Sequence, residues 1–98
     1  MPMYMYSPVS DHQQNASLNT MQTIRDNTRT ANAVIIQALS QNVRITLSGT
    51  ANGAVGFRIT AGADPVLLPI GNASFNAQQE AATATLEYQF VKVQGLGV

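Results

Sequence analysis

The stretch A-T-L-E-Y-Q-F at residues 84–90 decides the fold class, because large apolar residues alternate in it with polar ones. The apolar set consists of Ala84, Leu86, Tyr88 and Phe90. The positions between them hold Thr, Glu and Gln. A repeat of two residues is that of a β-strand with one buried face. We therefore expect this segment to be a strand that covers a core.

The next residues, Val91 and Val93, carry apolar side chains on the opposite phase of the same strand. A bulge in the strand would cause such a switch, and so would a strand edge that meets another subunit. We predict that Val91 and Val93 lie at a subunit contact.

Two segments upstream read as a hairpin. Residues 33–39, A-V-I-I-Q-A-L, are apolar on both alternating sets apart from Gln37, which is typical of a strand covered on both faces. Residues 43–47, V-R-I-T-L, alternate again after the turn S-Q-N. The alternative is one long helix over 18–39, but the β-branched run at 34–36 disfavours it.

Further short strands follow at 55–60 and 66–70, separated by turn signals such as Asn52-Gly53. Pro69 cannot donate a hydrogen bond to a ladder, so the second of these strands lies at an edge or ends there. Several short strands with turns between them predict an all-β fold, a small antiparallel sandwich or barrel. We assign this β domain to residues 33–98.

Residues 1–32 read as an extended N-terminal arm. Its tip alternates Met and Tyr, and the remainder is rich in Asn, Gln and Thr. Ser17 could cap a short helix in which Leu18, Met21 and Ile24 recur at a spacing of three. A disordered tail is the alternative, but the apolar tip favours an arm that orders against a partner.

The composition favours assembly. Only 10% of the 98 residues are charged, against about 25% in an average domain, and the net charge is zero. A chain with so little charge has weak self-repulsion and tends to associate. The five basic residues are scattered and matched by five acids, which disfavours a nucleic-acid partner.

We expect neither catalysis nor a cofactor. His12 is the single histidine and lies in the polar part of the arm, where a solvent-exposed role is the usual one. The five acids are dispersed and there is no cysteine, so no paired-carboxylate, metal or thiolate site is indicated. The apolar runs are far shorter than the ~20 residues of a membrane-spanning helix, so we expect no membrane partner.

Three short segments resemble a pattern found in small structural proteins of tailed bacteriophages. They are V-R-I-T-L-S-G-T at 43–50, G-F-R-I-T-A-G at 56–62 and A-T-L-E-Y-Q-F at 84–90. The resemblance covers roughly 33–93 and does not include the arm. Ser48 replaces the usual acid before the glycine, and Ala51 replaces a frequent proline, so no charge or metal role of that acid is carried over.

The resemblance implies a head decoration or cement protein, a class that commonly forms trimers on the capsid exterior and bridges capsid subunits. The implied partners are the major capsid protein and further copies of the chain in a homotrimer. The alternatives are a tail, neck or fibre-base adaptor, or a glycan-binding module, which the absence of Trp disfavours. The candidate interface residues are Met3, Tyr4, Met5, Tyr6, Arg25, Arg29, Val91 and Val93. For Arg25 and Arg29 the alternative role is solubility alone.

Overall fold

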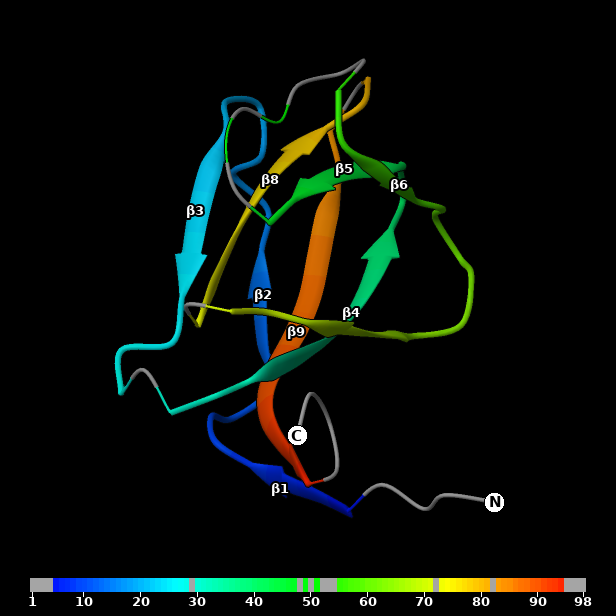
Figure 1. Ribbon diagram of the computed structural model, residues 1–98. Coiled ribbons are helices and arrows are strands. Elements are labelled where there is room, and N and C mark those ends of the chain that lie inside the picture. Colours follow the sequence, from blue (N-terminus) through cyan, green and yellow to red (C-terminus); the bar gives the residue numbers. More distant parts are fainter. Residues whose placement is uncertain are drawn as a thin grey trace.

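The computed structural model of the chain is all-β and consists of two antiparallel sheets packed against each other (Figure 1). The expected small β-sandwich is therefore confirmed. The structure describes residues 5–28, 30–47, 49, 51, 55–71, 73–81 and 83–94.

The two sheets draw their strands from distant parts of the sequence. The first sheet has the order β1 (Met5–Pro8), β9 (Thr85–Gln94), β4 (Ala33–Leu39) and β7 (Val66–Pro69), and β2 (Gln13–Asn15) also pairs with β9. The second sheet has the order β3 (Gln22–Arg25), β8 (Ser74–Gln79), β5 (Val43–Thr46) and β6 (Phe57–Ile59). Consecutive strands of the chain thus often lie in different sheets, and the expected hairpin of 33–39 with 43–47 is wrong because β4 and β5 belong to different sheets.

β4 and β9 form the centre of the first sheet. They pair one residue to one, from Ala33 opposite Val91 to Leu39 opposite Thr85. The same strand then pairs with β1 from Val91 to Gln94, again without an extra residue. The phase switch in β9 therefore needs no bulge. Its cause is that the buried face of β9 changes, because Phe90 lies in the main core whereas Val91 and Val93 lie in a second apolar cluster and Lys92 is exposed.

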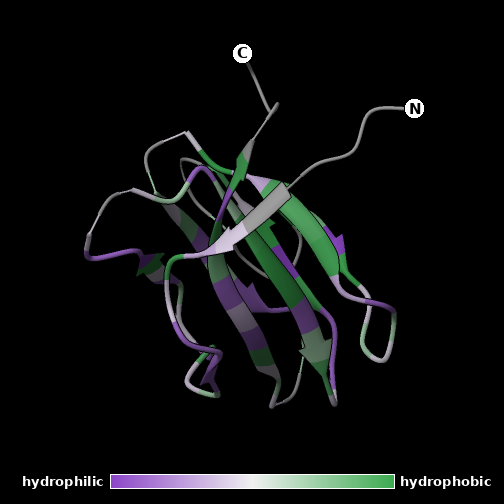
Figure 2. Cartoon of the chain, turned by 90° about the horizontal axis from the view of Figure 1, so that it is seen from below, coloured by the Kyte–Doolittle hydropathy of each residue, from purple (hydrophilic) through white to green (hydrophobic). Residues whose placement is uncertain are grey.

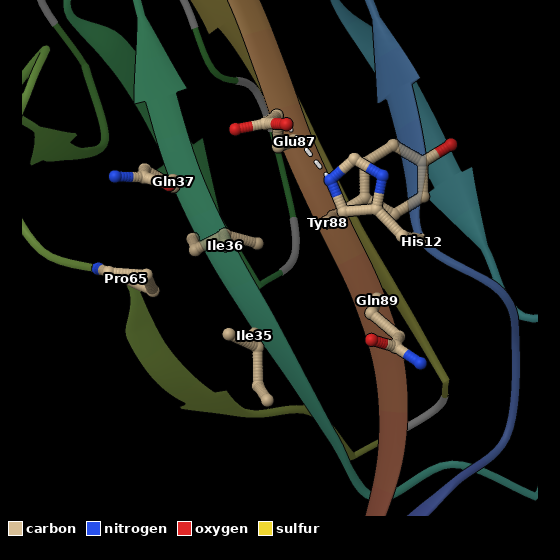
Figure 3. A pocket seen from close by; sticks show the side chains of 8 residues that line it. All are labelled: His12, Ile35, Ile36, Gln37, Pro65, Glu87, Tyr88 and Gln89. Atoms are coloured by element: carbon tan, nitrogen blue, oxygen red, sulfur yellow. Dashed lines mark ion pairs between the residues drawn. The ribbon is translucent and has the colours of Figure 1, made fainter.

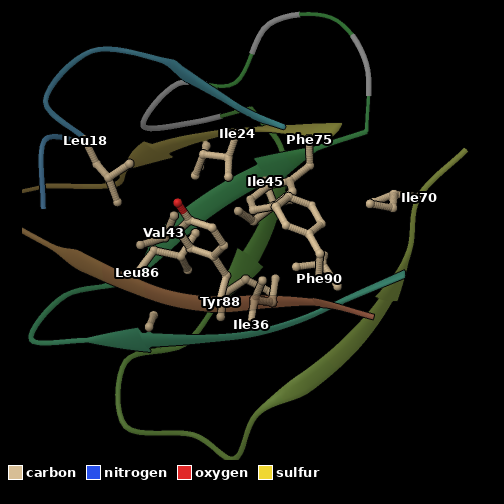
Figure 4. Packing of buried hydrophobic residues seen from close by; sticks show 14 of the residues in the cluster. Leu18, Ile24, Ile36, Val43, Ile45, Ile70, Phe75, Leu86, Tyr88 and Phe90 are labelled. Atoms are coloured by element: carbon tan, nitrogen blue, oxygen red, sulfur yellow. The ribbon is translucent and has the colours of Figure 1, made fainter. Parts of the chain in front are cut away.

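The main core lies between the sheets (Figure 4). The apolar set of β9, which the alternation at 84–90 predicts to be buried, faces this core. Phe75 of β8 meets Tyr88 and Phe90 of β9, and the ring centroids of the three lie 5.8 to 6.2 Å apart. The tilted and edge-on arrangement of these rings is the favourable one for aromatic groups. Coloured by hydropathy, the strands show bands of hydrophobic and hydrophilic residues (Figure 2).

The described part of the N-terminal segment is extended and is built into the sandwich. β1 and β2 pair with β9, whereas β3 pairs with β8 of the other sheet. Leu18 and Ile24 are both buried in the main core. The prediction of a short helix capped by Ser17 is wrong, and so is the alternative of one long helix over 18–39, because the described residues of both ranges form strands and loops. Ile24 lies buried between exposed neighbours in a strand, and Met21, the middle residue of the three-residue spacing, is exposed.

Asp26 organises the passage from β3 in the second sheet to β4 in the first. Its carboxylate is almost fully buried and accepts backbone hydrogen bonds from Thr28, Thr30 and Ala31 at 3.0 to 3.1 Å. The Thr28 hydroxyl adds a further bond at 2.9 Å. Burial raises the pKa of Asp26, but the hydrogen bonds from Ala31, Thr28 and Thr30 outweigh it and hold the pKa below its ordinary value.

The burial of Leu18 predicts that the N-terminal segment contributes to folding stability. Leu18→Ala should lower the free energy of unfolding by about 2–5 kcal/mol, because a fully buried leucine leaves a cavity. Leu47→Ala is the matched control, since Leu47 is 42% exposed, and it should cost about 1 kcal/mol or less. Urea unfolding measures both values. Equal losses would contradict the packing of the segment into the core.

The lowered pKa of Asp26 predicts a pH-dependent contribution to stability. A carboxyl with a depressed pKa in the folded state stabilises the fold above its unfolded pKa of about 3.9, and this contribution is lost as the pH falls through the folded pKa. Asp26→Asn should therefore be less stable than the parent at pH 7, and the gap should narrow between about pH 5 and 2. Urea unfolding across this range measures the gap, and a constant gap would contradict the assignment.

Candidate interaction surface

Three large apolar side chains at the end of β5 and the start of β6 are exposed. Leu47 is 42% exposed, Val55 49% and Phe57 70%. We name these three residues the Phe57 surface. Leu47 and Phe57 also line a hollow of about 420 Å³ together with Thr46 and Gly56. An exposed aromatic beside a hollow and other apolar groups is typical of a contact site for another protein.

The exposure of Phe57 follows from its place at the sheet edge. β6 pairs with β5, so that Phe57 lies opposite Ile45 and Ile59 opposite Val43. Ile45, Val43 and Ile59 are all buried, whereas Phe57 at the start of this edge strand is 70% exposed. Alternation of apolar residues at 55–60 predicts a half-buried strand, and the strand is confirmed. Its exposed aromatic residue was not predicted.

Gly56 allows β6 to approach β5 closely. Its φ is +121°, a value that side-chain-bearing residues rarely adopt. A Cβ built there would lie 3.0 Å from the backbone oxygen of Ile45. The glycine therefore fixes the direction in which the chain enters the Phe57 surface.

Two arginines and one glutamate hold the β5–β6 edge. Arg44 and Arg58 lie directly opposite each other, a like-charge pair that would destabilise the edge if it were alone. Oε2 of Glu80 lies 2.9 Å from Nε of Arg44 and accepts a hydrogen bond from Nε of Arg58 at 2.8 Å. This hydrogen bond from Arg58, with the charges of both arginines, lowers the pKa of Glu80 against the opposing effect of burial.

His12 has a partner that the sequence did not indicate. Its Nε2 lies 2.9 Å from Oε2 of Glu87, and the same oxygen accepts a hydrogen bond from Nε2 of Gln14 at 3.1 Å. The imidazole is nevertheless 57% exposed. The contact arises because β2 pairs with β9 and sets Gln14 opposite Glu87.

The expected interface residues of the arm fall in several places. Met5 and Tyr6 belong to β1, and Arg25 is exposed on β3. Met3, Tyr4 and Arg29 lie outside the described residues. The structure thus separates Arg25 from β1, because these strands belong to different sheets.

Val91 and Val93 are packed inside their own chain. They are 3% and 2% exposed and form a second apolar cluster with Ala33, on the face of the first sheet away from the main core. Ile35 and Leu67 pack against this cluster. The two valines therefore offer little side-chain area to another subunit.

The described residues contain no group of three or more His, Cys, Asp or Glu side chains that could hold a metal ion. In the same residues, no helix has the length and apolar character needed to cross a membrane. A scan for known protein families and searches among curated proteins and solved structures find no match to the chain.

We expect substitutions of Phe57 and Phe75 to differ sharply in their effect on the free energy of unfolding. Phe57→Ser should change the free energy of unfolding by no more than about 0.5 kcal/mol, because the side chain is mostly in solvent. Phe75→Leu should lower it by about 1–3 kcal/mol, since Phe75 is 1% exposed and meets two other rings. Thermal or urea unfolding of the two variants measures both changes. A large loss in the Phe57 variant would show that its side chain is covered.

Proposed function

We propose that this chain is a virion structural protein of a tailed bacteriophage, of the head decoration or cement type. It binds the capsid exterior as a homotrimer and stabilises the head by bridging neighbouring capsid subunits, without catalysis. The observation that supports this best is the Phe57 surface, three exposed apolar side chains at the β5–β6 edge of the second sheet. The resemblance of segments 43–50, 56–62 and 84–90 to small structural proteins of tailed bacteriophages implies that the partner is a capsid protein.

The proposal assigns the contact between copies to the Phe57 surface. The buried valines of β9 are poor candidates for that contact, whereas Phe57 is 70% exposed. Aromatic groups are enriched at the centre of protein interfaces because they provide large area with few rotatable bonds. The zero net charge of the chain leaves no general repulsion between copies.

Contact with the capsid is assigned to the opposite end of the domain. Figure 1 shows β1 at one end of the molecule and β6 toward the other, and the longest dimension is 37 Å. Met5 and Tyr6, the second half of the apolar tip, belong to β1. A protein with separate contact sites at its two ends is suited to bridging.

The energetics favour a trimer over a single attached copy. Burial of apolar area contributes about 25 cal/mol per Å², so one small surface gives only several kcal/mol before the association cost of about 4–15 kcal/mol. Linked copies bind a repeated lattice at several points, which raises the overall affinity without new contacts. The low charge of the chain therefore matches a task in which many weak contacts add up.

Sedimentation with undecorated capsids of the parent phage tests the proposal. The parent chain should pellet with the capsids and raise the temperature at which they open. Phe57→Ser should weaken both effects at least about tenfold in half-saturating concentration, which corresponds to about 1.4 kcal/mol per contact. Val66→Ser is the matched control, because Val66 is also exposed, at 42%, but lies on β7 of the other sheet.

A further truncation tests the second contact. Removal of residues 1–4 deletes Met3 and Tyr4 but leaves all described strands in the chain, and it should reduce attachment to capsids while leaving the trimer intact. If the parent chain neither pellets with the capsids nor stabilises them, the proposed function is wrong.

A further inference from the structure

A small pocket lies on the face of the first sheet that points away from the main core. It encloses about 100 Å³ and lies over the β4–β9 ladder (Figure 3). Its lining residues are His12, Ile35, Ile36, Gln37, Pro65, Glu87, Tyr88 and Gln89. The outward-facing polar groups come from β4 and β9, where Gln37 lies opposite Glu87 and Ile35 opposite Gln89.

One N–H donor of each of the two glutamine amides is already used by the chain. Nε2 of Gln37 donates to the backbone oxygen of Ala63 at 3.0 Å. Nε2 of Gln89 donates to the backbone oxygen of Ser10 at 2.9 Å. Both amides are thereby fixed in orientation, with their nitrogens turned to neighbouring loops. Figure 3 shows the nitrogen of Gln37 directed away from Glu87.

The acceptors of these groups remain unused. Within the described part of the chain, no hydrogen bond reaches Oε1 of Gln37, Oε1 of Gln89 or Oε1 of Glu87. The other carboxylate oxygen of Glu87 is held by His12 and Gln14. Figure 3 shows the free oxygen of Glu87 directed away from His12, toward β4. The polar lining therefore presents a free carboxylate oxygen of Glu87 and the carbonyl group of Gln37 on the opposite strand, while one N–H of each glutamine amide is bonded elsewhere.

We propose that this pocket binds the guanidinium group of an arginine side chain from a protein partner. A guanidinium has five N–H donors, no acceptor and a fixed positive charge, so it complements a carboxylate that lies opposite an amide carbonyl. Ile35 and Pro65 give the pocket an apolar wall, which suits the methylene stem of arginine. Because the amides are already held by hydrogen bonds, their side chains lose little conformational freedom on binding.

The inference does not depend on the proposed function. It concerns the chemistry of one group on a partner, whichever protein supplies it. It can also hold if the chain does not bind capsids, because the pocket lies on the first sheet and the Phe57 surface on the second. The experiment therefore uses a small probe and the isolated chain.

NMR titration of the ¹⁵N-labelled full chain with n-butylguanidinium at pH 8 tests the pocket. The amide signals of residues 35–37 and 87–89 should shift and saturate, with a Kd on the order of millimolar for so small a ligand. The neutral isostere n-butylurea has the same planar shape without the charge, and it should bind at least about fivefold more weakly. Shifts that spread over the whole chain, fail to saturate, or are equal for the urea would overturn the proposal.

Substitution of Glu87 tests whether its carboxylate is the charge that binds the guanidinium. Glu87→Gln should reduce the affinity for n-butylguanidinium to that for the urea. Glu80→Gln makes the same change on the other sheet and should leave the titration unaltered. Unaltered binding by the Glu87 variant would refute the site. The comparison of guanidinium with urea uses the unmodified chain, so it decides the proposal even if a variant fails to fold.

Discussion

β4 and β9 pair along all seven residues of β4, and every other strand of the first sheet is attached to one of these two. β1 and β2 lie on β9, and β7 lies on β4. The side chains that β9 turns inward also supply two of the three rings at the centre of the core, which the second sheet covers. If this pairing shifted by one residue, those inward side chains would move to the opposite face. The register is therefore strongly specified.

This central ladder also explains what is left uncovered. β6 is an edge strand of the second sheet, in which Ile59 is buried in the core and Phe57 is exposed. An exposed apolar side chain at such an edge lowers the free energy of unfolding only slightly, but it leaves apolar surface in contact with water. Glu80 keeps the two arginines of this edge together, so the aromatic side chain is presented on a fixed strand. The proposed adhesive function uses this uncovered area.

The strands with a clear repeat could be predicted from sequence, whereas the long-range contacts could not. The alternation at 84–90 and the two-faced run at 33–39 correctly indicated a half-buried and a central strand. The strands within 13–25 have weak patterns because they are short edge strands that depend on β9 and β8 for their pairing. The same holds for His12, since only the register of β2 on β9 brings it to Glu87. The exposure of Phe57 depends on what packs over the edge strand β6, which no local pattern records.

The mass of the chain in solution tests most directly whether the Phe57 surface joins copies of the protein. Sedimentation equilibrium from micromolar to millimolar concentration should give a trimer for the parent chain. The same measurement on the Phe57→Ser variant should shift the equilibrium toward the monomer while the fold is retained. A parent chain that remains monomeric over this whole range, or a variant that assembles as well as the parent, would contradict the account.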